Sequence, residues 1–75
     1  MTSMFQVVAT RAFEEWRDCI HTRARIVNAL RSARGARADG LAALERYFDG
    51  RARLLWRRFR VAYARVVVTR RISAI

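Results

Sequence analysis

The spacing of apolar side chains along the chain predicts both strands and helices. Residues 5–9 form a short apolar run with two β-branched side chains, which favours a strand. Thr10 then offers a hydroxyl cap for a helix, and Phe13, Trp16 and Ile20 recur at helical intervals along one face. We therefore expect an N-terminal strand followed by an amphipathic helix.

The apolar stripe shifts near Thr22, which indicates a second helix. Thr22 can cap this helix, and Ile26 and Leu30 continue the helical spacing toward Gly35, a residue type that often ends helices. Residues 34–40 combine two glycines with small and charged side chains, and this composition favours a loop. The first half of the chain is thus predicted to hold one strand, two helices and a loop.

The second half of the chain is harder to interpret. Leu41, Leu44 and Phe48 have helical spacing, and the dipeptide Asp49-Gly50 is a turn signal. After this turn two periods compete, since one set of apolar positions would suit a helix and another set alternates as in a strand.

The helical interpretation rests on Leu55, Phe59 and Ala62, which would lie on one helix face. The strand interpretation rests on alternation over residues 58–67 and on the β-branched run 66–69, and it is the one we favour for the end of the chain. The expected fold is α+β and dominated by helix. It has an N-terminal strand, two helices and a small or incomplete antiparallel sheet, within a single domain of residues 1–75. An all-α fold is the alternative.

Positive charge is concentrated in the last third of the chain. All sixteen basic residues are arginine, and the net charge is +10. Residues 1–50 carry eight arginines and all six acids, a net charge of +2, whereas residues 51–75 carry eight arginines and no acid, a net charge of +8. Such a segment attracts RNA, DNA, an anionic membrane or an acidic protein.

Several kinds of site are excluded or weakened by composition. His21 is the single histidine and Cys19 the single cysteine, so a zinc site lacks ligands and no internal disulfide can form. We interpret both as structural residues. We expect no cofactor, no bound metal and no membrane-spanning segment, because no apolar run approaches the roughly 20 residues of a span. A lone thiol and the lack of a secretion signal favour the cytoplasm.

Two segments carry a family resemblance. Residues 10–35 include Phe13 and Trp16 in a Phe-x-x-Trp pattern, followed by the Ala-Arg-Ile triplet at residues 24–26, and residues 59–63 read Phe-Arg-Val-Ala-Tyr. In these segments the chain resembles HigB-like addiction module killer toxins of the RelE/ParE superfamily. The central residues 41–56 do not follow that family's pattern. A frame-slipped or degenerate relative is therefore a further interpretation.

The resemblance implies a toxin of a type II toxin–antitoxin module. Such a protein would be a metal-independent endoribonuclease acting on free or ribosome-bound mRNA, and an acidic segment of an antitoxin would inhibit it. By position in the matching segment, Arg60 and Tyr63 are the candidate catalytic residues. An arginine can stabilise charge on a phosphoryl group, and a tyrosine can take part in proton transfer. The structural alternative is a solvated Arg60 and a packed Tyr63.

A wider set of residues is predicted to contact nucleic acid. Arginine recognises phosphates with two parallel hydrogen bonds, and an exposed tryptophan can stack on a base. The candidates are Arg51, Arg53, Trp56, Arg57, Arg58, Arg70 and Arg71. For Trp56, anchoring in the core or against a partner is the favoured alternative. A non-catalytic arginine-rich module that binds nucleic acid or a membrane surface, or a degenerate inactive toxin, is the alternative function.

Overall fold

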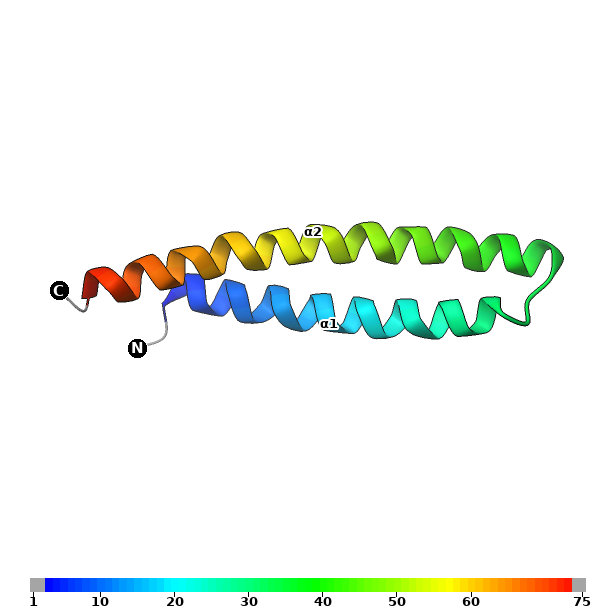
Figure 1. Cartoon of the computed structure of the whole chain (residues 1–75), viewed down its shortest axis with the longest axis horizontal. Coiled ribbons are helices and arrows are strands. Elements are labelled where there is room, and N and C mark those ends of the chain that lie inside the picture. The colour runs from blue at the N-terminus through cyan, green and yellow to red at the C-terminus, as the bar shows by residue number, and fades with distance from the viewer. Residues whose placement is uncertain (1–2, 74–75) are drawn as a thin grey trace.

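Two long helices joined by a short turn make up the chain. The computed structural model describes residues 3–73, in which α1 spans Met4–Leu30 and α2 spans Gly35–Ser73. The helices run antiparallel and side by side in a rod of 61 × 16 × 15 Å (Figure 1). Residues 3–73 contain no strand, so the α+β prediction is wrong and the all-α alternative is correct.

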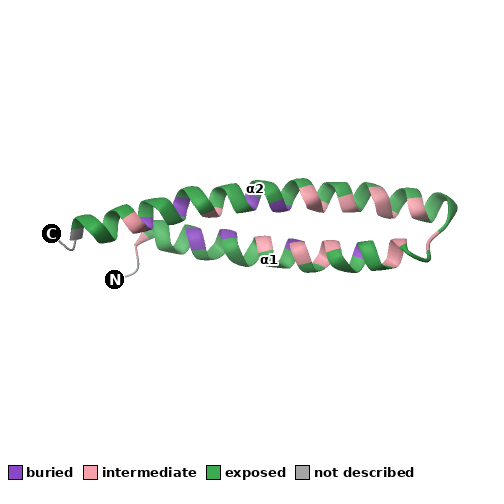
Figure 2. Ribbon diagram, viewed as in Figure 1, coloured by how far each residue is buried: buried purple, intermediate pink, exposed green. Residues whose placement is uncertain are grey.

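The helices contact each other along a seam that repeats every seven residues. The side chains facing the other helix are spaced alternately by three and four residues, the spacing of a coiled coil, and they are buried or half-buried (Figure 2). In α1 the seam residues are Ala9, Ala12, Trp16, Cys19, Arg23, Ile26 and Leu30; in α2 they are Leu41, Glu45, Phe48, Ala52, Leu55, Phe59, Ala62 and Val66.

Small side chains dominate the buried part of this seam. Ala9, Ala12, Cys19, Ala52 and Ala62 are all buried, and Leu55, 1% exposed, is the one large side chain that is fully enclosed within residues 3–73. Around Leu55 the core also includes Trp16, Ile20 and Phe48, which are partly buried. Small residues allow a close approach of the two helices, but most of the large apolar side chains then remain at the edges of the seam.

The predicted N-terminal strand is wrong, because residues 5–9 belong to the first turns of α1. The cap is Ser3 rather than Thr10: its Oγ accepts a hydrogen bond from the Gln6 backbone N–H at 3.1 Å. The β-branched side chains of this segment favour a strand only weakly, whereas Ala9 lies at a seam position. Packing against α2 therefore decides the conformation.

The predicted break at Thr22 is also wrong, since α1 continues to Leu30. The apolar stripe is interrupted there because a charged residue, Arg23, occupies a seam position. Its Nε donates a hydrogen bond to Glu45 Oε1 at 2.8 Å and lies 3.7 Å from Asp49 Oδ1. Carboxylates from α2 thus let the guanidinium occupy a half-buried place in an otherwise apolar seam.

The turns lie elsewhere than predicted. Gly35, with a φ of 61°, begins α2 instead of ending a helix, and residues 35–40 of the predicted loop are helical. The predicted turn at Asp49-Gly50 lies inside α2, where Asp49 Oδ2 is 3.2 Å from Arg53 Nη2 one turn later. Seam contacts on both sides of the dipeptide, at Phe48 and Ala52, keep the helix continuous.

The end of the chain is helix as well. Leu55 and Ala62 are buried and Phe59 half-buried, which confirms the helical face that these three residues suggested. The favoured strand over residues 66–69 is wrong. A β-branched residue lowers helix stability by only about 0.5 kcal/mol, whereas burying the Val66 side chain contributes about 1.5 kcal/mol.

We expect opposite effects from alanine at two glycines. Gly50→Ala should raise the free energy of unfolding by about 1 kcal/mol, because Gly50 lies inside a helix and an added methyl group meets no atom within 4 Å. Gly35→Ala should lower it by about 1 kcal/mol, because its positive φ disfavours a side chain. Urea denaturation followed by circular dichroism measures both. A loss of stability in Gly50→Ala would indicate a turn at this position.

Candidate nucleic-acid interface

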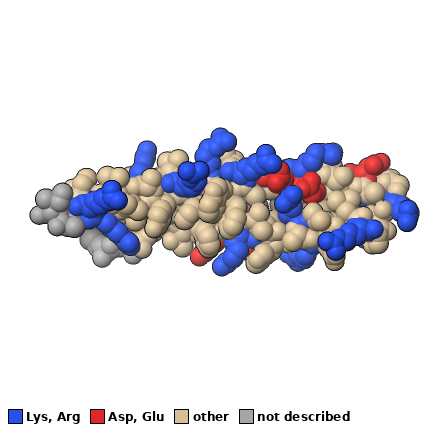
Figure 3. Space-filling model, in the orientation of Figure 1, with Lys and Arg blue, Asp and Glu red and all other residues tan. Residues whose placement is uncertain are grey.

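Arginines without acidic neighbours cover one end of the rod. The antiparallel arrangement places residues 57–73 of α2 alongside the first turns of α1, and residues 3–13 and 57–73 together contain seven arginines and no Asp or Glu. On the face shown in Figure 3, arginine side chains lie at this end, and the acidic side chains lie toward the middle and the turn. The hairpin thus has a strongly cationic end opposite the turn.

The arginines that were predicted to contact nucleic acid are all exposed, but they are not all free of ion pairs. Arg51 Nη2 lies 3.8 Å from Glu15 Oε2, and Arg53 pairs with Asp49. Within residues 3–73 no carboxylate lies within 4.0 Å of the remaining arginines of the cationic end. On α2 these are Arg57, Arg58, Arg60, Arg65, Arg70 and Arg71. Their charge is available to an external anion.

The candidate catalytic residues Arg60 and Tyr63 lie one turn apart on α2, and both are exposed. Arg60 lines a shallow depression that it shares with Trp56 and Val61. Tyr63 lines a different depression, where its ring stacks on Phe59 with the ring centroids 5.6 Å apart. The two side chains are therefore not brought into one pocket.

Trp56 belongs to a cluster of five aromatic rings that extends from the seam residues Trp16 and Phe59 to one side of the seam. Its ring centroid lies 4.8 Å from that of Trp16 and 5.3 Å from that of Phe59, which in turn contacts Phe13 and Tyr63. Trp56 is 39% exposed, so part of its surface packs on the other helix and part faces solvent. The cluster could not be predicted from the sequence, because its members come from two helices whose register the sequence does not reveal.

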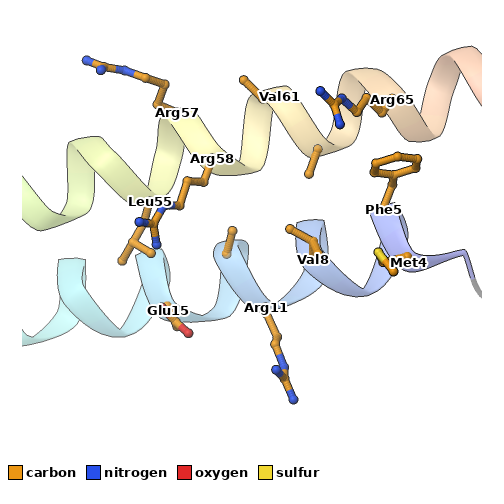
Figure 4. Close-up of a pocket in the computed structure, with 12 residues that line it drawn as sticks. Met4, Phe5, Val8, Arg11, Glu15, Leu55, Arg57, Arg58, Val61 and Arg65 are labelled. Carbon is orange, nitrogen blue, oxygen red and sulfur yellow. The ribbon is translucent and has the colours of Figure 1, made fainter.

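An apolar groove bordered by arginines lies on the other side of the seam (Figure 4). It has a volume of about 560 Å³ and lies between residues 4–15 of α1, its first three turns, and residues 55–65 of α2. Its apolar lining includes Phe5, Val8, Leu55 and Val61, and the guanidinium carbon of Arg65 lies 5.3 Å from the Phe5 ring centroid. This groove was not predicted either, because residues 5–9 were expected to form a strand.

Other chemistry finds little support in the described part of the chain. No group of three or more His, Cys, Asp or Glu side chains among residues 3–73 could hold a metal ion. His21 is exposed on α1, and Cys19 is buried in the seam. In residues 3–73 neither helix has an apolar stretch sufficient to cross a membrane.

A comparison of the chain with models of known protein families, with curated proteins and with solved structures found no match.

Proposed function

We propose that the chain binds RNA, with little sequence specificity, through the arginine-rich half of α2. The observation that carries this proposal is the set of exposed arginines without carboxylate partners at the cationic end. Residues 57–71 extend over about 21 Å of helix, which is long enough to follow several phosphates of one strand. Because one guanidinium group can donate two parallel hydrogen bonds to phosphate oxygens, several exposed arginines along this length of helix suit a polyanion.

The shape of the surface favours binding to the nucleic-acid backbone over reading of bases. Arg57 extends away from α1 in Figure 4, and Arg60 lines only a shallow depression. Neither position offers an enclosed pocket in which a base edge would be recognised. The choice of RNA among polyanions rests on the resemblance to RNA-cleaving toxins and on the partly exposed Trp56, on which an unpaired base can stack.

Salt dependence and paired charge variants test this proposal. If six arginines contact phosphates of a single-stranded RNA, the logarithm of the binding constant should fall with the logarithm of salt concentration with a slope of about −4. The variant Arg57→Gln/Arg60→Gln should bind more weakly and reduce the slope by about 1.4. Fluorescence anisotropy with a labelled RNA measures both values.

The matched control removes the same charge at the other end of the rod. Arg34→Gln/Arg37→Gln alters two exposed arginines near the turn. This variant should reduce RNA affinity much less than the double variant at Arg57 and Arg60 does. Equal losses in the two double variants would contradict the location of the interface. Equal affinity for duplex DNA would contradict the assignment to RNA.

The resemblance over residues 10–35 supports a second proposal, that the chain acts as a toxin that cleaves mRNA. We rank it below binding, because the matching segment at residues 59–63 is helix and because Arg60 and Tyr63 line different depressions. If the toxin proposal is correct, Arg60 would stabilise charge on the phosphate, and the Tyr63 hydroxyl would transfer a proton.

Induction of the chain in bacterial cells tests the toxin proposal. Growth should slow and transcripts should be cut, and Arg60→Ala should abolish both effects. Tyr63→Phe should reduce cleavage, whereas Tyr47→Phe, which alters an exposed tyrosine near the turn end, should not. Unchanged growth and transcripts, with an identical result for Arg60→Ala, would remove the catalytic assignment.

A further inference from the structure

A two-helix hairpin leaves more surface exposed than a compact protein of its size. The chain exposes 6148 Å² of surface, whereas a compact monomer of 8.8 kDa exposes about 4800 Å². The excess of roughly 1400 Å² exceeds the surface of about 800 Å² that one partner contributes to a typical protein interface. The molecule therefore has unburied surface to offer to a partner.

Part of this unburied surface is apolar and lies in the groove on the side of the seam opposite the aromatic cluster. Met4, Phe5, Val8 and Val61 line it, and each is among the exposed large apolar side chains. Its wall on α1 runs over residues 4–15, about 17 Å or three helical turns. A groove between two antiparallel helices has the shape that a third helix fills, since apolar side chains spaced by three and four residues can pack into it.

The charges around the groove restrict the partner. Arg11, Arg57, Arg58 and Arg65 line it together with one acid, Glu15. A second copy of this chain would bring the same arginines against them, and like charges placed close together oppose association. A helix with acidic residues beside its apolar face would instead meet opposite charge along the α2 edge, which carries three of the arginines and no acid. On the α1 edge Arg11 and Glu15 offset each other.

We propose that the groove between α1 and α2 binds an acidic amphipathic helix of a partner protein, about three turns long. Apolar residues of that helix would contact Phe5, Val8 and Val61, and its carboxylates would pair with the bordering arginines. This inference does not depend on RNA binding, because its central contacts are apolar. Together with α1 and α2, the partner helix would form a three-helix bundle.

A synthetic helical peptide of seventeen residues, with leucine at the a and d positions of the heptad and glutamate beside them, is the probe. It should bind the full chain and gain helicity, as measured by fluorescence anisotropy and circular dichroism. A peptide of the same composition with the leucines scattered around the helix should bind at least about tenfold more weakly, because it cannot present one apolar face. Equal binding of the two peptides would show attraction by charge alone and would overturn the proposal.

Two valine variants of α1 locate the peptide. Val8→Asp places a carboxylate in the groove and should weaken binding about tenfold. Val27→Asp adds the same charge to an exposed valine near the turn and should leave affinity within about twofold. Equal effects of the two substitutions would overturn the proposal. Circular dichroism monitors folding.

Should Val8→Asp lose its helical signal, the pair Val61→Asp and Val68→Asp provides the same comparison on α2. Both valines are 54% exposed, and only Val61 lines the groove. The proposal would also be overturned if the groove were shown to bind either of two other occupants. One is a dimer, seen by sedimentation, that Val61→Asp dissociates. The other is groove-dependent binding to vesicles of equal parts phosphatidylcholine and phosphatidylglycerol without binding of the peptide.

Discussion

The seam between α1 and α2 is the one contact surface that holds residues 3–73 in a hairpin, and its small side chains determine most other properties of the molecule. Ala9, Ala12, Ala52 and Ala62 let the helices approach closely but bury little apolar area. Leu55 and the partly covered residues around it therefore carry much of the packing. The remaining large side chains lie at the edges of the seam, where they form an aromatic cluster on one side and an apolar groove on the other.

The ion pair between Arg23 and Glu45 favours the observed register of this seam. A shift of one helix by seven residues would keep the apolar spacing but would break the 2.8 Å hydrogen bond between these two side chains. Losing this half-buried contact disfavours the shifted arrangement. The correct register also places the acid-free start of α1 beside residues 57–73, so no carboxylate of either helix neutralises the cationic end. The same alignment therefore sets both the fold and the charge distribution.

Helix is predictable from the large apolar stripe over Phe13, Trp16 and Ile20, whereas the stripe of Leu55, Phe59 and Ala62 left helix and strand open. The prediction was wrong at Ala9, which lies in a segment assigned to a strand, and at Arg23, where a charged seam residue interrupts the apolar stripe. Residues 5–9 and 66–69 were assigned to strands from the preferences of β-branched side chains, and seam packing outweighs those preferences.

The exposed arginines could be predicted from composition alone, since no acid follows Asp49 in the chain. The groove and the aromatic cluster could not, because both depend on which residue of α1 lies opposite which residue of α2. Arg11 and Arg65, for example, are 54 positions apart in the sequence but line the same groove. Such a pairing becomes visible only when the antiparallel register is known.

Because Cys19 is buried between the two helices, the reactivity of its thiol reports how often the helices separate. Its thiol is 6% exposed and lies in the core cluster with Ala52 and Leu55. A thiol reagent can reach the sulfur readily only when the two helices part. The rate of alkylation, compared with that of an unfolded chain, therefore measures how often the hairpin opens, in a protein with a single cysteine to modify.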